Sequence, residues 1–221
     1  MRKPLLLGHR GARGVKGIPE NTLPAFDLAV ARGCDGFEFD VQLTADGQPV
    51  VGHDAEIGGF EIARSSAQAL KLPLLSEVLA RYQSSAFLDI ELKVPGLETI
   101  TLDLLREHLP KCGFVVSSFL PEVLETMHSR DAKIPLGLIC ETRVQLGRWS
   151  GSPVEYVIPH FRLVEPGLVG EISAMGKKTL VWTVNAPADM RRFADWGVDG
   201  IISDDPEQLS YTLGRRSEAP E

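Results

Sequence analysis

Residues 36–54, GFEFDVQLTADGQPVVGHD, place two carboxylates inside an apolar stretch. Glu38 and Asp40 alternate there with phenylalanine and valine side chains. Alternate side chains of a β-strand lie on opposite faces, so these two acids share one face and lie about 6.6 Å apart along it. Because an unpaired buried charge is costly, that face needs a compensating partner.

A second stretch, FLDIELK, repeats this alternation and places Asp89, Glu91 and Lys93 on one face. Neighbouring strands of a sheet lie about 4.8 Å apart, so Glu38, Asp40 and Glu91 can converge on one point. Three clustered carboxylates repel one another unless a hard divalent cation binds them. The pattern therefore predicts a site for one divalent metal ion, Ca²⁺ or Mg²⁺, with Mn²⁺ also compatible with oxygen ligands.

Other polar residues close to the ends of apolar runs allow two interpretations each. A histidine such as His9 commonly caps a core, but the adjacent Arg10 and the sequence GARG favour a functional site. The Arg10 guanidinium can pair with Glu20 or bind a phosphate in a bidentate manner. Asp89, the deepest acid of its strand, is expected to pair with Lys93 or Arg10. Trp182 either fills the interior or contacts a substrate.

The elements that position these residues alternate along the chain. Apolar runs predict eight strands, at residues 5–8, 36–41, 86–92, 114–117, 134–139, 156–158, 179–184 and 200–203. Amphipathic stretches between them predict helices at residues 22–32, 75–82, 97–109, 121–129, 166–175 and 188–196. Strands that alternate with helices form parallel sheets, and eight such units predict a closed (β/α)8 TIM barrel in the α/β class. The polar residues then meet at the carboxyl ends of the strands, where barrel enzymes hold their active sites.

A longer connection, residues 44–74, separates the second and third predicted strands and contains several glycines. It is expected to be a short insertion, either a loop or a small hairpin over one end of the barrel. Residues 1–213 form one domain in this interpretation. The polar tail at residues 214–221 is expected to be disordered.

Composition narrows the possible partners. The chain has 221 residues, 43% of them hydrophobic, and a net charge of -7. It has no cluster of lysine and arginine, which argues against binding to nucleic acid or to an anionic membrane. Three cysteines without metal-binding spacing argue against disulfides and zinc. The first apolar run is too short for a signal peptide and no window is long enough for a membrane span, so a cytoplasmic location is expected.

Seven motifs, in this order, resemble the glycerophosphodiester phosphodiesterase family, and in particular its short intracellular members. They are GHRG, PENTLPAF, GFEFDVQLTADGQPVVGHD, LDIELK, VVSSF, VWTVN and GVDGIISDDP, and the resemblance extends from residue 7 to about residue 208. It implies a (β/α)8 barrel and the hydrolysis of small-molecule glycerophosphodiesters to glycerol 3-phosphate and an alcohol.

The resemblance also implies a role for individual residues. Those that match the family's motifs are catalytic His9 and His53, substrate-binding Arg10, Lys93 and Trp182, and metal-binding Glu38, Asp40 and Glu91. The two histidines would act as general acid and general base, with water or a neighbouring glycerol hydroxyl as the nucleophile. After Asp54 the chain lacks the arginine and threonine motif and the longer insertion of the family, which leaves the alcohol specificity open.

Two alternative functions are compatible with the same residues. A phosphodiesterase acting on lysophospholipids would keep the site, although no basic amphipathic stretch accompanies it. A non-catalytic barrel that binds metal and anion would not need two histidines. The sequence carries no signal for an oligomeric state.

Overall fold

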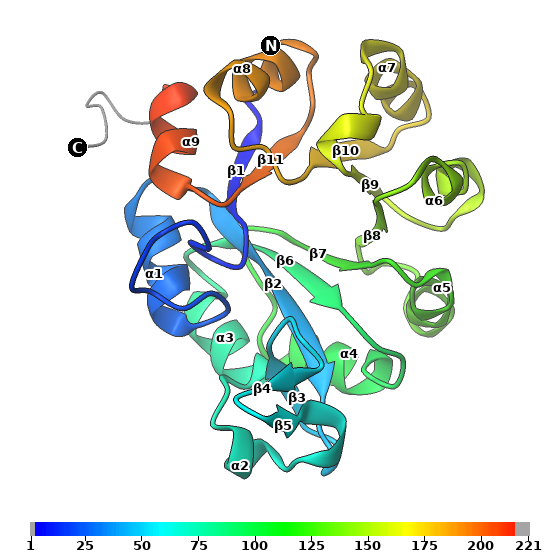
Figure 1. Cartoon of the computed structure of the whole chain (residues 1–221). Helices are drawn as coiled ribbons and strands as arrows, with labels where there is room; N and C mark the ends of the chain where they lie inside the picture. The colour runs from blue at the N-terminus through cyan, green and yellow to red at the C-terminus, as the bar shows by residue number, and fades with distance from the viewer. Residues whose placement is uncertain (1–2, 215–221) are drawn as a thin grey trace.

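The computed structural model describes residues 3–214, in which eight parallel strands close into a barrel (Figure 1). Around the ring they are β1 (Leu5–Gly8), β11 (Gly200–Ser203), β10 (Lys178–Val181), β9 (Tyr156–Pro159), β8 (Leu136–Cys140), β7 (Phe114–Ser118), β6 (Phe87–Leu92) and β2 (Gly36–Leu43). The ring closes because β1 pairs with both β11 and β2. The predicted (β/α)8 barrel is therefore confirmed.

Helices form a layer around the strand ring (Figure 1). They are α1 (Leu23–Ala31), α3 (Leu75–Tyr82), α4 (Glu98–Glu107), α5 (Pro121–Arg130), α6 (Arg143–Leu146), α7 (Pro166–Ala174), α8 (Pro187–Asp195) and α9 (Pro206–Thr212), with short 3₁₀ turns at Trp149–Gly151 and Phe161–Leu163. The Thr22 hydroxyl caps α1 by accepting a hydrogen bond from the backbone of Ala25, and Gly33 follows with a φ of 92°. The sequence did not predict α6 and α9, because neither is long enough to show a clear period.

The connection between β2 and β6 contains the expected small hairpin. Its strands are β4 (Glu56–Ile57) and β5 (Phe60–Glu61), joined by two glycines at positive φ. The 3₁₀ turn Ile62–Arg64 and α2 (Ala67–Leu70) follow. An additional strand, β3 (Pro49–Val51), pairs antiparallel with the last residues of β2, outside the barrel ring. Of the tail expected to be disordered, all but Gly214 lies outside the described residues.

Alternation along the strands creates two cores. On the outer face, Phe37 and Phe39 pack beneath α1, where the Phe26 ring stacks on Phe37 with a centroid distance of 4.3 Å. The inner face carries a separate apolar cluster, made of Leu7, Phe87, Val115, Ile139, Tyr156, Ile158, Leu180 and Ile202. Since Glu38 and Asp40 alternate with the two phenylalanines, their side chains project into the barrel.

Replacement of Phe26 tests this outer core. The side chain is fully buried, so Phe26→Ala is expected to lower the free energy of unfolding by about 3 to 5 kcal/mol. Urea denaturation would measure the loss. Phe60→Ala is the matched control, because Phe60 is 54% exposed and its loss should change stability by no more than about 0.5 kcal/mol. Equal losses in the two variants would contradict this account of the core.

Candidate active site

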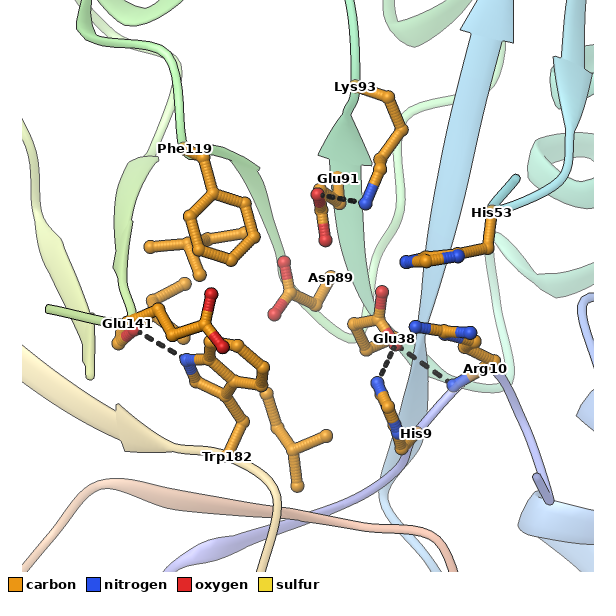
Figure 2. A pocket seen from close by; sticks show the side chains of 13 residues that line it. His9, Arg10, Glu38, His53, Asp89, Glu91, Lys93, Phe119, Glu141 and Trp182 are labelled. Carbon is orange, nitrogen blue, oxygen red and sulfur yellow. Dashed lines mark hydrogen bonds and ion pairs between the residues drawn. The ribbon is translucent and has the colours of Figure 1, made fainter. Parts of the chain in front are cut away.

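A cavity of about 280 Å³ opens at the carboxyl ends of the strands. Figure 2 shows that its lining differs from one side to the other. The segments β1, β2 and β6 and the residues following them supply a polar wall, consisting of His9, Arg10, Glu38, His53, Asp89, Glu91 and Lys93. The strands β7 to β11 and their carboxyl ends supply a largely apolar wall, consisting of Phe119, Ile139, Glu141, Ile158, Trp182 and Ile202.

The three predicted metal ligands lie together on the polar wall. The pairing of β2 with β6 places Asp40 beside Glu91 and Glu38 beside Asp89. One oxygen from each of Glu38, Asp40 and Glu91 lies within 4.8 Å of the others, and all three residues are buried. The predicted convergence is thus present.

Burial and mutual repulsion control the protonation of this cluster. Burial and the neighbouring charges of Asp40 and Glu91 raise the pKa of Glu38 well above its usual value. Burial, followed by the charge of Asp40, raises the pKa of Glu91 to about 7. Burial also acts to raise the pKa of Asp40, but Lys93 and Arg10 outweigh it and lower that pKa. A set of buried oxygens with excess negative charge fits a hard divalent cation.

Two cations border the cluster. Lys93 Nζ lies 2.8 Å from Glu91 and 3.1 Å from Asp40, and these carboxylates raise the pKa of Lys93 despite its burial. Arg10 Nε lies 3.3 Å from Asp40, while Arg10 Nη1 donates to Glu20 at 2.6 Å. The Arg10 pair with Glu20 is therefore present, and it fixes the guanidinium at the edge of the cavity.

The structure contradicts the predicted partners of Asp89. Its carboxylate accepts a hydrogen bond of 2.5 Å from the Ser117 hydroxyl on β7, and among the described residues it forms no ion pair with Lys93 or Arg10. The reason is its depth, because Asp89 lies one inward position below Glu91 and therefore below the two cations. Burial raises the pKa of Asp89 to about 7.

Both histidines are oriented by carboxylates. His9 Nδ1 lies 2.6 Å from Asp204, which Asn185 holds from the other side at 2.7 Å. His53 Nδ1 lies 2.7 Å from Asp54. An Nδ1 proton donated to the carboxylate leaves Nε2 as the free proton acceptor of each ring. His9 Nε2 is 3.8 Å from Glu38, and Figure 2 shows both rings directed toward that carboxylate.

Sequence reasoning assigned no role to three of the residues that hold this arrangement. Asp204 and Asn185 support His9, and the Asn21 amide donates to Asp40 at 2.8 Å. The backbone of Arg10, at a φ of 48°, donates to Glu38 at 2.9 Å. Such a conformation costs energy in a residue other than glycine and is concentrated at functional sites. Asn21, Asn185 and Asp204 belong to the motifs PENTLPAF, VWTVN and GVDGIISDDP that carried the family resemblance. The motifs alone do not show which side chains these three residues contact.

Trp182 fills the barrel interior, which is one of the two interpretations that the sequence allowed, and it also borders the cavity. Its indole Nε1 donates to the carbonyl of Ile158 at 2.9 Å, which anchors the ring to β9. The indole face lines the cavity and meets the Phe119 ring edge-on at 5.6 Å between centroids. The residue therefore fills the barrel end and also walls the cavity.

A closed barrel with polar side chains gathered at the carboxyl ends of its strands defines the class of TIM-barrel enzymes. Within that class, the sequence profile of the glycerophosphoryl diester phosphodiesterase family matches residues 9–99 and 58–208. The chain belongs to this family and is an enzyme that hydrolyses phosphoric diesters of glycerol.

Relatives and solved structures agree with this assignment. A glycerophosphodiester phosphodiesterase of Caldanaerobacter subterraneus subsp. tengcongensis is 33% identical over 236 residues, covering 94% of this chain and 96% of that protein. A phosphodiesterase of Oleispira antarctica, solved in complex with the product sn-glycerol-3-phosphate, has a TM-score of 0.84 at 26% identity and covers 96% of this chain and 97% of its own. A Thermotoga maritima structure shares the fold, with a TM-score of 0.81 at 24% identity over 94% of this chain and 97% of that one.

Helices in the described part of the chain are all too short or too polar to cross a bilayer.

The raised pKa values predict how stability depends on pH when no metal is bound. The pKa values of Asp89 and Glu91 are raised to about 7 and that of Glu38 is raised as well, whereas unfolded carboxyl groups titrate near pH 4. Between about pH 4 and about pH 7 the folded state therefore binds more protons than the unfolded state, so the free energy of unfolding decreases as pH rises through this window.

In chelator, we accordingly expect a lower Tm at about pH 8 than at about pH 5.5, by about 2 to 4 °C for each kcal/mol lost. Differential scanning calorimetry would measure it. Divalent cation should raise the Tm mainly at the higher pH, and Asp89→Asn should weaken the pH dependence. A Tm in chelator that increases over this range would contradict the protonation of the cluster.

Proposed function

We propose that the chain hydrolyses glycerophosphodiesters to glycerol 3-phosphate and an alcohol with the help of one divalent metal ion and two histidines. The supporting observation is that His9 and His53, each held at Nδ1 by a carboxylate, face a cluster of three buried carboxylates in one cavity. The sn-glycerol-3-phosphate bound to the Oleispira antarctica phosphodiesterase supports the product.

Glu38, Asp40 and Glu91 would hold the cation, which is Ca²⁺ or Mg²⁺, with Mn²⁺ as a further candidate. When bound, this ion supplies a Lewis acid that withdraws charge from a phosphate oxygen. Arg10 and Lys93 neutralise the remaining phosphate oxygens. Their neighbouring carboxylates keep both side chains charged, because those carboxylates raise the pKa of each despite its burial.

The two imidazoles act as general base and general acid. One ring, neutral with its proton on Nδ1, would accept the proton of the attacking oxygen at Nε2, and the other, entering the step as an imidazolium, would donate its Nε2 proton to the leaving alcohol. Asp204 and Asp54 orient the two rings and fix the tautomer with Nε2 toward the cavity. Trp182 positions the substrate by walling the opposite side of the cavity.

The cytoplasmic location expected from the sequence stays a prediction. All three cysteines are free thiols, and two of them, Cys34 and Cys140, are buried. Burial raises the pKa of each buried thiol to about 12. The cysteine state is compatible with a reducing compartment.

Release of glycerol 3-phosphate is the direct test. Protein stripped of metal by a chelator is expected to release none from glycerophosphocholine or glycerophosphoethanolamine, and either Ca²⁺ or Mg²⁺ should restore release. A coupled enzymatic assay for glycerol 3-phosphate would measure it. Full activity in chelator would refute the metal requirement, and no release with any cation from folded protein would refute the substrate.

Variants distinguish proton transfer by the two histidines from metal binding by the carboxylates. His9→Ala and His53→Ala should each reduce kcat by about 10² to 10⁴-fold, because each removes one proton-transfer group, while metal affinity stays nearly intact. Glu38→Gln should lose both activity and metal affinity. Isothermal titration calorimetry with the restoring cation would measure affinity, and His128→Ala, on the exposed side of α5, is the control. Equal loss of metal binding in all three site variants would overturn this division of roles.

A further inference from the structure

The apolar wall of the cavity contains one acidic residue. Glu141 follows β8 and is the single charged member of the side formed by β7 to β11 among the described residues that line the cavity. Along β8, Leu138 and Cys140 face the helices while Ile139 faces the interior, so Glu141 continues the inward-facing positions. Figure 2 shows its carboxylate directed toward the cavity beside the Trp182 indole.

This carboxylate is exposed, and its charge acts on the neighbouring His160, where it partly offsets the lowering of the pKa by burial and by Arg162. Within residues 3–214, its oxygens form no hydrogen bond and no ion pair; only its backbone N–H is engaged, donating to Gln145 at 2.9 Å. The two arginines of the same rim are occupied elsewhere. Arg143 pairs with Glu165 at 3.4 Å, and the Arg162 guanidinium lies over the Phe161 ring at 5.5 Å from its centroid. A single unpaired charge on an apolar wall is a determinant of ligand orientation.

The remaining groups on this wall limit what can bind there. Aliphatic and aromatic side chains offer no hydrogen bonds, and the Trp182 Nε1 proton is already donated to Ile158. A glycerol unit would find one acceptor and no donor. A substituted ammonium group, in contrast, gains from aromatic faces, from apolar contact with its carbon atoms and from one carboxylate. Lys93 lies 5.9 Å from the Phe119 centroid but belongs to the polar wall, where the substrate phosphate would offset its charge.

We infer that Glu141, together with Phe119 and Trp182, binds the alcohol part of the substrate and selects alcohols that carry an ammonium group, such as choline and ethanolamine. The inference rests on the proposed function and assigns the substrate class of the same site. The phosphate then lies at the polar wall and the cationic alcohol extends across the cavity to Glu141.

The test compares substrates that differ in the charge of the alcohol. In the metal-restored holoenzyme, kcat/KM is measured for glycerophosphocholine and for glycerophosphoglycerol, whose alcohol is neutral. Glu141→Gln should lower the ratio of the two values about fivefold, the size expected for the loss of a partly exposed ion pair while the aromatic contacts remain. Glu141→Lys should lower it further, and the change should appear mainly in KM for the cationic substrate. Free choline should inhibit wild-type protein more strongly than Glu141→Gln.

Glu165→Gln is the matched control, because it removes the same charge from the same rim but lies outside the cavity lining. This control should leave the ratio unchanged. An equal loss for both substrates in Glu141→Gln would assign Glu141 to the shared glycerol unit and overturn the inference, as would an unchanged ratio. Failure of wild-type protein to hydrolyse either substrate with any cation would refute the proposed function instead, so the two failures are distinguishable.

Discussion

Repulsion among buried carboxylates is the constraint on which the rest of this structure depends. Four acids, Glu38, Asp40, Asp89 and Glu91, lie buried on two adjacent strands. Two buried or partly buried cations, a serine hydroxyl and an asparagine amide offset part of their charge. The compensation is incomplete, because the pKa values of Glu38, Asp89 and Glu91 remain raised. Folding energy from the apolar cores therefore holds together a site whose repulsion a bound divalent cation would reduce.

The fold keeps this strained cluster in place by separating its two strand faces. The outward residues of β2 pack in an aromatic group with Phe26 and Tyr82, whose rings lie 4.3 to 6.1 Å apart. The inward residues have no freedom to rotate toward solvent, since the neighbouring strands bracket them. The parallel register of the neighbouring strands places the other polar residues at the same end of the barrel. His9 lies on one side of β2, and Glu91 and Ser117 lie on the other.

The alternation of strands with helices along the chain was enough to predict the barrel. The alternation of side chains along each strand was enough to predict the polar wall. It placed Glu38, Asp40 and Glu91 on one face, and the strand ends placed His9 and Arg10 beside them, whereas the role of His53 came from the family resemblance. The sequence placed Asp89 deepest on its strand, but alternation does not show that this depth takes it out of reach of Lys93 and Arg10 and beside Ser117 of β7, so the partners predicted for Asp89 were wrong. Alternation also gives no contact between distant segments, so the contact of Asp204 with His9 and that of Asn185 with Asp204 could not be derived from it. The strand predicted at residues 179–184 ends at Val181, because the chain leaves regular pairing at Trp182.

The contact between His9 and Asp204 spans 195 positions of sequence, and this separation has a consequence for biosynthesis. Every residue of the polar wall is present once residue 93 has emerged from the ribosome, so the cluster of Glu38, Asp40 and Glu91 is made before the strands of the apolar wall. Asp204 follows β11, the last strand to be made and the one that pairs with β1. A nascent or truncated chain therefore lacks the group that orients His9, and the arrangement around the cavity is complete only when the ring closes.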